Sequence, residues 1–464
     1  MTLSLALRNL LRNRRRSLAT LLALAIGSAS ILMFGGYSTN IKYTMLSSYV
    51  RTGGHLQIQH RDFFLYGSGN PTSYGIAGYE SLIKAITDDP SLKGLIRVVS
   101  PVLQFGGIAG NYEESVSRTV VGIGQVATDI NRMRQWNEFD IALKSPRFML
   151  EGATPDAAIV GVGVARVLLL CDPLGVKNCA RPKRDTPKLG AALPADILAL
   201  SAAEATSAAT AAKSSEARLE LLSSNGRGTP NIAALKVIAA EGLGFKELDD
   251  VAVILQLEQA QKLVYGREVP RVTSIMLQLE RTAQIPAATK KLEALLAQQQ
   301  NADSLVVLDF QTLNPFYVQT LQLFDTIFGF IFVLIGGIVL FTVGNTMMAA
   351  VVERTVEIGT VRAIGVRQQG IRRLFIAEGC VLGCAGALTG TAVALLVALI
   401  VNSLNLTWLP PGSTEPLPLS LVIWGETRML IGTASGLLLV AVASAWWPAY
   451  RASRLKIVDA LRHV

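Results

Sequence analysis

Between Val351 and Gly379 the sequence reads VVERTVEIGTVRAIGVRQQGIRRLFIAEG, a short basic segment with a long apolar run on either side. Apolar and small residues recur in it at helical spacing, as Val352, Val356, Gly359 and Ala363 do. A basic segment between two membrane spans is placed on the cytoplasmic side by the positive-inside rule. The pattern therefore predicts a short cytoplasmic helix that contacts lipid headgroups or a cytoplasmic partner.

The composition is that of a membrane protein. Half of the 464 residues are hydrophobic and only 17% are charged, which is too apolar for an ordinary soluble domain. The net charge of +9 comes largely from basic residues bunched beside the apolar runs. Because these residues form no basic stripe with interleaved aromatic residues, no binding of nucleic acid is expected.

Four apolar runs are long enough to cross a bilayer. They predict transmembrane helices at residues 17–36, 321–352, 375–401 and 429–448. The first run follows five arginines and could be a secretory signal peptide, but its core is long for that and no clean cleavage site follows it. Glu378 lies near the cytoplasmic end of the third run, where its carboxylate can stay close to the headgroups.

The basic residues predict the orientation of these spans. Residues 1–16, 353–374 and 449–464 are basic, so we expect a cytoplasmic N-terminal segment, a cytoplasmic coupling helix and a cytoplasmic tail. The loop at residues 402–428 contains no basic residue before Arg428 and is placed outside. The predicted fold is therefore an integral membrane α-helical protein of the inner (plasma) membrane. It has four transmembrane helices and a large extracytoplasmic domain between the first and the second.

The extracytoplasmic domain at residues 37–320 is predicted to be α+β. Alternation of apolar and polar residues predicts five strands, and a helical pattern predicts a helix at Ile285–Gln298. The predicted strands are His55–Gln59, Val98–Phe105, Thr119–Ile123, Thr273–Leu279 and Leu305–Phe310. A stretch rich in Ala and Ser at about residues 181–228 is interpreted as an insert, either a helix or a loosely ordered loop.

Cys171 and Cys179 flank a polar loop of the predicted external domain. A disulfide bond suits an extracytoplasmic loop, and a pair of buried free thiols is the alternative. Small residues spaced for close helix packing recur in the spans, within the chain or across a dimer, although such residues are also simply common in membrane helices. The predicted packing residues are Ala19, Ala23 and Gly27 in the first span, Gly386 and Gly390 in the third, and Gly432 and Gly436 in the fourth.

Several kinds of chemistry have no signal in the sequence. It contains no G-x-x-x-x-G-K-[ST] loop for ATP, so no nucleotide is expected to bind to this chain. The three histidines are not clustered with other ligands, so no metal site is expected. No charged residue lies in the middle of the second, third or fourth span, which argues against a channel or a secondary transporter.

The segment Glu353–Gly365 resembles the signature that follows the second span in the FtsX/MacB/LolC-like family of ABC transporter permeases. The stretches Ala6–Leu22 and Pro448–Arg462 are similar to the beginning and the end of that family. In the external domain, Gly161–Leu170 and Gly242–Leu263 resemble the lipoprotein-releasing branch, LolC and LolE. The resemblance covers nearly the whole chain.

The resemblance implies a mechanotransmission permease that is not itself an enzyme. Two copies of a separate P-loop ABC ATPase would bind ATP and Mg²⁺ in trans, and a second permease chain would complete a homo- or heterodimer in the lipid membrane. A periplasmic carrier or adaptor protein is a further implied partner. The short helix would dock on the ATPase, and the coupling residues implied are Glu353, Arg354, Glu357, Ile358, Gly359, Arg362, Ala363 and Gly365. Charge-assisted contacts of its acids and arginines suit that role, and a basic loop that binds headgroups is the alternative.

The function expected from the resemblance is release or export of a lipoprotein, or of another lipid-like cargo, from the outer leaflet of the inner membrane. One alternative is MacB-like efflux of small molecules or peptides with a periplasmic adaptor. Another is FtsX-like regulation of a cell-wall hydrolase.

Overall fold

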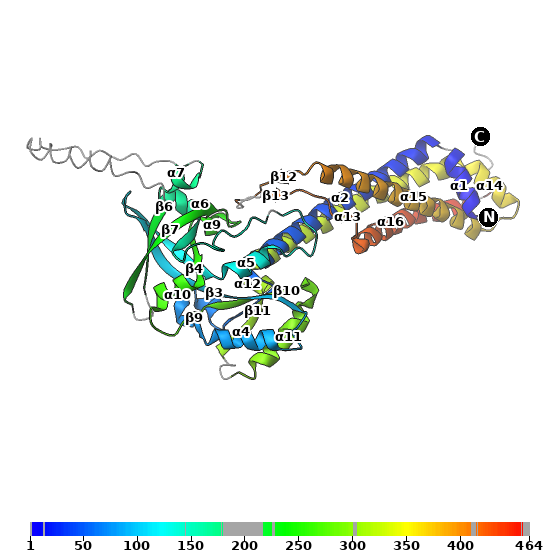
Figure 1. Ribbon diagram of the computed structural model, residues 1–464. Helices are drawn as coiled ribbons and strands as arrows, with labels where there is room; N and C mark the ends of the chain where they lie inside the picture. The colour runs from blue at the N-terminus through cyan, green and yellow to red at the C-terminus, as the bar shows by residue number, and fades with distance from the viewer. Residues whose placement is uncertain are drawn as a thin grey trace, which may run out of the picture. The chain divides into compact units, whose positions relative to one another are not determined.

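The computed structural model describes residues 2–12, 14–143, 145–177, 179, 217–224, 228–299, 304–409, 414, 416–455 and 457 (Figure 1). The chain forms two compact units. The helical unit comprises Met1–Met45, Phe316–Trp408 and Pro418–Val464, and the sheet unit comprises Leu46–Pro315 and Leu409–Leu417.

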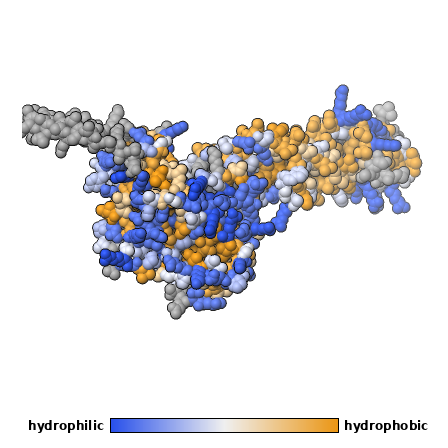
Figure 2. All heavy atoms as spheres, viewed as in Figure 1, coloured by the Kyte–Doolittle hydropathy of each residue, from blue (hydrophilic) through white to orange (hydrophobic). Residues whose placement is uncertain are grey.

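Four helices of the chain are long and apolar enough to cross a membrane. They are α2 (Arg14–Gly53), α13 (Pro315–Glu353), α15 (Gln368–Ser403) and α16 (Thr427–Ser453). Apolar residues cover the visible face of the helical unit (Figure 2), and the helices share a core that includes Leu24, Val343, Leu382 and Leu437. The four predicted spans fall within these helices, as a membrane-embedded protein requires.

The first span is part of a much longer helix than predicted. Helix α2 has 40 residues, which corresponds to about 60 Å at a rise of about 1.5 Å per residue, roughly twice the hydrocarbon thickness of a bilayer. The boundary expected at residue 36 is therefore no helix end. The helix continues to Gly53, and Gly54 then adopts a positive φ of 77°. Such a conformation suits glycine because it has no Cβ.

Two shorter helices complete the helical unit: α1 (Thr2–Arg12), which precedes α2, and α14 (Thr355–Ala363), which lies between α13 and α15. After α15 the chain forms the short strands β12 (Thr407–Trp408) and β13 (Leu417–Pro418).

The first layer of the sheet unit has the chain order β-α-β-β-α-β. Its strands lie in the order β11-β1-β10-β3, with all three pairings antiparallel. Helices α4 and α11 pack on the sheet through an apolar core that contains Leu82, Ile86, Leu292 and Leu56. The bounds are β1 (Leu56–His60), α4 (Tyr79–Asp88), β3 (Ile96–Asn111), β10 (Ser274–Leu279), α11 (Ile285–Leu296) and β11 (Leu305–Asp309).

The second layer is a ring of strands inserted between β3 and β10. The strands lie in the order β3-β4-β8-β5-β7-β6, and β6 pairs back with Ile108–Gly110 of β3. Closing the ring leaves no unpaired edge along these strands, which removes a site of edge-to-edge aggregation. The bounds are β4 (Val116–Gln125), β5 (Ala157–Gly161), β6 (Ala217–Ser224), β7 (Pro230–Glu241) and β8 (Ala252–Gln256).

Shorter elements lie between the strands and helices of these two layers. They are α3 (Phe63–Tyr66), η1 (Pro71–Tyr74), β2 (Ile76–Ala77), α5 (Ala127–Arg134), α6 (Val162–Val167), α7 (Cys171–Leu174), α9 (Lys246–Asp249), α10 (Leu257–Tyr265), β9 (Arg271–Val272), η2 (Thr282–Gln284) and α12 (Phe310–Leu313).

The five predicted strands and the predicted helix correspond to β1, β3, β4, β10, β11 and α11. The interpretation of residues 181–228 as one insert is wrong at its C-terminal end, because Ala217–Ser224 is a strand of the ring. Its side chains alternate between buried and more exposed positions, as expected for a strand with one face in the core. The rest of the predicted insert lies almost entirely outside the described residues.

The last turn of α2 is anchored to the sheet unit by polar contacts. Arg51 Nε donates a hydrogen bond to the carbonyl of Trp136 at 2.6 Å, and Gln278 Nε2 donates one to the carbonyl of Val50 at 3.2 Å. Beside them, buried His55 accepts the backbone N–H of Leu279 on Nδ1 at 3.0 Å. Burial disfavours the charged imidazolium and lowers the pKa of His55 to about 3.

Candidate functional site

The predicted coupling helix is α14, and both of its ends follow from local sequence. Helix α13 ends at Glu353, and Arg354 breaks the helical path with φ −103° and ψ 17° before α14 begins. After α14, Gly365 adopts a φ of 106°, which residues with a Cβ rarely adopt. The segment is thus a short separate helix between two long ones.

Arg354 is held in a buried polar network. Its Nη1 lies 3.1 Å from Glu378 Oε1 of α15, and the two side chains are only 8% and 3% exposed. Asn9 of α1 donates its amide Nδ2 to the same Glu378 oxygen at 2.8 Å, and its carbonyl accepts Arg354 Nη2 at 3.0 Å. The residue that separates α13 from α14 is therefore bonded to both α1 and α15. The sequence led us to expect the carboxylate of Glu378 close to the headgroups. In the structure this carboxylate is buried and faces Arg354 instead.

Two exposed ion pairs join the acids of this segment to the N-terminal arginines. Arg12 Nη2 lies 2.6 Å from Glu357 Oε1, and Arg16 Nη1 donates to Glu353 Oε2 at 2.8 Å. Both acids are more than half exposed, so water and salt screen each pair and it contributes little to the free energy of unfolding. The two arginines and the two acids have the same four-residue spacing, which is a signal that could have predicted the pairing.

The far end of α14 is bonded to the end of α16. The guanidinium of Arg362 donates a hydrogen bond to the carbonyl of Leu455. Nearby, the guanidinium groups of Arg372 and Arg454 lie 5.1 and 4.4 Å from the ring centroid of Tyr450, within range of cation–π attraction. Helix α14 therefore bonds to α1 through Glu357 and to the residues just after α16 through Arg362. The bonds to α2 and α15 are made by Glu353 at the end of α13 and by Arg354 at the break.

An apolar surface remains on α14 and the turn after it. Ile364 is 80% exposed, and Val356, Val361 and Val366 are also exposed. Gly365 and the basic Arg367 lie beside Ile364 and are exposed too. This set of apolar residues beside an arginine is what α14 presents to its surroundings.

The structure separates the eight predicted coupling residues into two groups. Glu353, Glu357, Ala363 and Gly365 are exposed, and Arg362 is partly exposed. Arg354, Ile358 and Gly359 are buried within the chain, and contact of the eight residues with an ATPase stays a prediction. Ile358 belongs to the core of the helical unit, so these three residues hold α14 in place.

Four of the predicted packing glycines lie close to another helix. A Cβ added to Gly386 would lie 2.4 Å from Leu24 Cβ, and one added to Gly390 would lie 2.4 Å from Ser28 Cβ, so both glycines allow α15 to approach α2 closely. Gly27 and Gly436 face α13 at Ile335 and Phe332, with corresponding distances of 3.0 and 2.7 Å.

Three of the predicted packing residues are not fully buried in the described part of this chain, and their packing across a dimer stays a prediction. No atom of the described residues lies within 4 Å of a Cβ added to Gly432. In α2, Ala19 is exposed and Ala23 is only partly buried. The buried positions are instead those of Thr20, Leu24 and Ser28, one residue further along. Thr20 Oγ1 lies 3.1 Å from Thr346 Oγ1, a hydrogen bond between α2 and α13.

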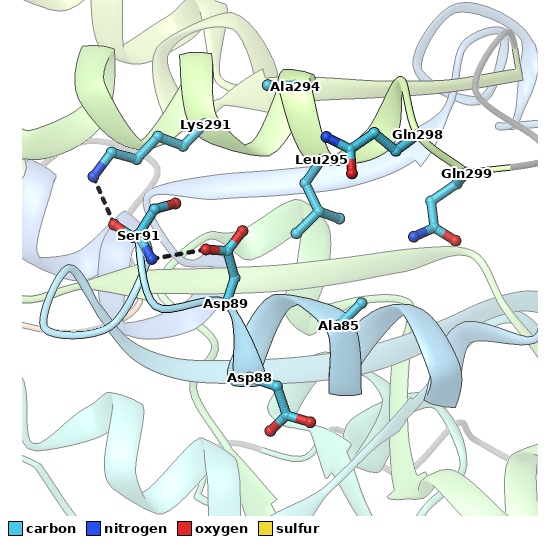
Figure 3. A pocket seen from close by; sticks show the side chains of 9 residues that line it. All are labelled: Ala85, Asp88, Asp89, Ser91, Lys291, Ala294, Leu295, Gln298 and Gln299. Atoms are coloured by element: carbon cyan, nitrogen blue, oxygen red, sulfur yellow. Dashed lines mark hydrogen bonds between the residues drawn. The ribbon is translucent and has the colours of Figure 1, made fainter.

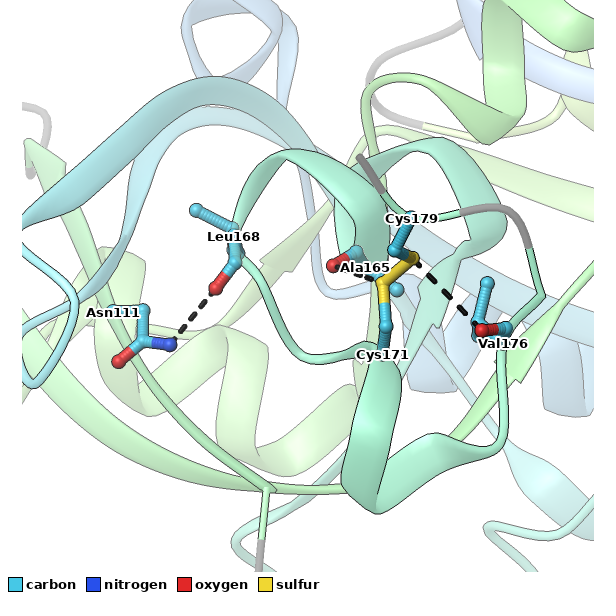
Figure 4. The surroundings of a disulfide bond; sticks show 6 residues. All are labelled: Asn111, Ala165, Leu168, Cys171, Val176 and Cys179. Atoms are coloured by element: carbon cyan, nitrogen blue, oxygen red, sulfur yellow. Dashed lines mark hydrogen bonds between the residues drawn. A yellow bond between two sulfur atoms is a disulfide. The ribbon is translucent and has the colours of Figure 1, made fainter. Parts of the chain in front are cut away.

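In the sheet unit, Cys171 and Cys179 are joined by a disulfide bond (Figure 4). Cys171 is buried beside α6, and the turn after α6 is tied to β3 because Asn111 Nδ2 donates to the carbonyl of Leu168 at 2.8 Å. The disulfide thus closes a small loop on a fixed part of the ring of strands.

A pocket of about 490 Å³ lies between α4 and α11 (Figure 3). Its polar groups bond to one another: Lys291 Nζ donates to the carbonyl of Ser91 at 2.6 Å, and the N–H of Ser91 donates to Asp89 Oδ1 at 2.7 Å. This N–H lowers the pKa of the Asp89 carboxyl. The pocket holds no nucleophile beside a base, and the described residues contain no group of His, Cys, Asp and Glu that could hold a metal ion.

The model of the family "FtsX-like permease C-terminal" matches residues 326–457, which begin within α13 and end just after α16. The macrolide export ATP-binding/permease protein MacB of Bdellovibrio bacteriovorus is 27% identical over 243 residues. These matches support the assignment of the chain to the FtsX/MacB/LolC family of ABC transporter permeases. The four apolar helices fit such a membrane-embedded permease with an extracytoplasmic domain.

The matched regions are parts of the relatives. The match to Bdellovibrio MacB covers 50% of this chain and 34% of that protein. A second MacB, from Shigella boydii, is 35% identical over 143 residues, which is 31% of this chain and 20% of that protein. The chain thus spans about a third or less of the length of these curated relatives.

Two solved structures are similar to part of this FtsX-like permease. The extracellular domain of the ABC-type transporter YknZ from Gram-positive bacteria matches with a TM-score of 0.28 and 12% identity, over 55% of this chain and 99% of that one. The periplasmic region of MacB from Actinobacillus actinomycetemcomitans matches with a TM-score of 0.29 and 12% identity, over 57% of this chain and 94% of that one.

Proposed function

We propose that this permease is the membrane subunit of an ABC exporter and that a separate ABC ATPase binds at α14. The observation that carries the proposal is the exposed apolar surface around Ile364, at the end of a short helix whose other side is held by the spans. A group of exposed apolar side chains beside an arginine, here Val356, Val361, Ile364 and Val366, suits a contact with another protein. A basic loop that binds only headgroups would not place acids and apolar residues at this position.

The proposed assembly follows from the family. Two copies of this permease, or this chain and a related one, bind two ATPase subunits in the cytoplasm. The basic segments at residues 1–16, 353–374 and 449–464 face that side of the plasma membrane, and the sheet unit faces outward. Helix α2 contributes residues to both units without a break, so it is suited to carry a movement from one to the other.

The proposed cargo is an amphipathic molecule taken up from the outer leaflet or the periplasm. The names of the curated relatives, macrolide export proteins, favour efflux of a small molecule of that kind, and a periplasmic adaptor is part of the proposal from the resemblance alone. The alternative of lipoprotein release rests on the resemblance of Gly242–Leu263. In the structure that stretch forms α9, β8 and α10, and its apolar residues Val253, Leu255 and Ala260 lie in the core. These residues therefore support the fold rather than a particular cargo.

The experiment is reconstitution of the full permease in lipid nanodiscs with a candidate ABC ATPase. Ile364→Glu should abolish binding of the ATPase and the stimulation of its ATP hydrolysis, because a carboxylate would be desolvated in the interface. The control is Trp424→Glu, at an apolar residue of the same unit that is 84% exposed but lies before α16. Equal binding of both variants and the unchanged protein would show that α14 is not the docking site.

The same preparation tests the cargo. Stimulation of ATP hydrolysis by a macrolide, and none by an acylated lipopeptide, would support efflux of small molecules. The opposite result would support lipoprotein release. Stimulation only by a purified cell-wall hydrolase would support the regulatory alternative.

A further inference from the structure

The ion pair of Arg354 with Glu378 differs from the two ion pairs nearby because it is buried. The guanidinium of Arg354 and the carboxylate of Glu378 are almost fully removed from solvent, whereas the pairs of Arg12 with Glu357 and of Arg16 with Glu353 are open to water and salt. Transfer of two charges into a protein interior costs several kcal/mol per ion, which their attraction often only offsets. The pair is therefore a poor means of stabilising the bundle.

Its position indicates another role. Arg354 is the single residue between α13 and α14, where the backbone leaves the helical path. Backbone hydrogen bonds continue across it, from Arg354 N–H to the carbonyl of Ala350 and from Ile358 N–H to the carbonyl of Arg354, so the two helices are joined there by a single non-helical residue. The side chain at this break is bonded to α15 through Glu378 and to α1 through the carbonyl of Asn9, and Asn9 is also bonded to Glu378.

We propose that Arg354, Glu378 and Asn9 form a lock that prevents bending at the α13–α14 break, so that α14, α1 and the cytoplasmic end of α15 move as one body. Arg354 and Glu378 are positioning residues because they act through the placement of α14. The purpose of the lock rests on the proposed function, since it would pass a thrust on α14 directly to the spans.

Two further contacts complete the geometry of the lock. Ile358, one turn after Arg354, packs in the core with Val351 and Ile371, and Arg362 bonds to the carbonyl of Leu455, just after α16. These contacts keep α14 attached to the helical unit, but neither of them is made by the residue at the break. Loss of the buried pair would therefore loosen the break while α14 stays attached.

The decisive variant is the double substitution Arg354→Met and Glu378→Met. Replacement of a buried ion pair by apolar residues of similar size often leaves stability unchanged or raises it, so this variant separates the lock from a simple contribution to stability. Glu378→Gln is the second variant, because it keeps an acceptor for Asn9 and Arg354 but removes the charge.

The first readout needs no ATPase. Spin labels at Leu7→Cys in α1 and Thr360→Cys in α14, both exposed, report the distance between the two helices in the full permease in nanodiscs. Cys380 and Cys384, the free cysteines of the described residues, are replaced by Ala in this background. We expect one narrow distance distribution with the native pair and a broad one with the double Met variant. An equally narrow distribution with an unchanged melting temperature would overturn the lock, and Glu378→Gln supplies the same comparison if the double variant does not fold.

The second readout is coupling to the ATPase. We expect the double Met variant to bind the ATPase with unchanged affinity but to lose about tenfold in cargo-stimulated hydrolysis, a change within the range of known coupling effects. Full coupling in this variant would refute the purpose of the lock. If the native permease recruits no ATPase at all, the proposed function fails, while the distance measurement still decides whether the lock exists.

Discussion

Substitution Gly390→Ala tests how closely α15 approaches α2. The added Cβ would lie 2.4 Å from Ser28 Cβ and 2.5 Å from the carbonyl oxygen of Ala25. The latter atom belongs to the backbone, so no rotation of a side chain can relieve the contact. Helix α2 would have to move by about 1 Å to restore ordinary van der Waals distances, and insertion of a methyl group into such a tight contact costs about 1–3 kcal/mol.

A second term opposes this cost. Alanine is favoured over glycine within a helix by about 1 kcal/mol, so the net loss of unfolding free energy at Gly390 should be about 0–2 kcal/mol. Gly432→Ala is the matched control, because no described atom lies within 4 Å of its added Cβ. That variant should gain up to about 1 kcal/mol from helix propensity alone.

The measurement is equilibrium unfolding of both variants and the native permease in the same detergent. The difference between the two variants, about 1–3 kcal/mol in favour of Gly432→Ala, is independent of helix propensity because it cancels. Equal stabilities would mean that α2 and α15 do not approach each other at Gly390 and that the glycine has no packing role.

Three further predictions follow from other contacts. The pKa of His55 is lowered from 6.5 to about 3, so the unfolded chain takes up a proton that the folded chain does not. The free energy of unfolding should therefore fall by about 1.4 kcal/mol per pH unit as the pH drops from 6.5 toward 3. In His55→Asn the unfolding free energy should change less between pH 7 and pH 5 than in the native protein. The double variant Cys171→Ser, Cys179→Ser should have an unfolding free energy about 2.5 kcal/mol lower than the native protein. The melting temperature should fall by the same amount in this variant and in the native protein after reduction. Glu357→Ala and Arg12→Ala should each weaken the stimulation of ATP hydrolysis slightly, and the double variant should lose no more than either single one. If the losses multiply in the double variant, Glu357 contacts the ATPase itself.

The sequence predicted the membrane helices well because their signal is local. Twenty or more apolar residues have few structural alternatives, and the arginines beside them indicate orientation. The strands with one face toward solvent, such as β1 and β4, were predicted from their alternation for the same reason.

Two of the strands that the sequence did not reveal, β5 and β8, lack this alternation. All five residues of β5 and four of the five in β8 are buried, so each reads as a short apolar run that a buried helix could equally produce. Strand β6 does alternate, but it follows directly on a long stretch of Ala and Ser whose composition dominated the interpretation of that region.

The candidate site could be located from sequence but not resolved into its parts. The segment after the second span was correctly predicted to be a short helix, yet the partners of its charges lie far away in the chain: Glu357 and Arg12 are separated by 345 positions. No local pattern states whether a charged residue faces a partner protein or another part of its own chain. The decision depends on burial, which arises only when α1, α14 and α15 are packed together.

This packing changes what the charges of the segment mean. In an isolated amphipathic helix, Arg354 and Arg362 would both be available for an acidic partner surface. In the folded unit, Arg354 is paired with Glu378, Glu357 with Arg12 and Glu353 with Arg16. The positive charge that remains on α14 and the turn after it lies on Arg362, which donates to a carbonyl, and on the exposed Arg367. The apolar side chains at Val356, Val361 and Ile364 are exposed beside these arginines. Recognition of α14 by a partner should therefore combine buried apolar area with attraction by the two arginines, and only the second contribution should weaken as salt is added.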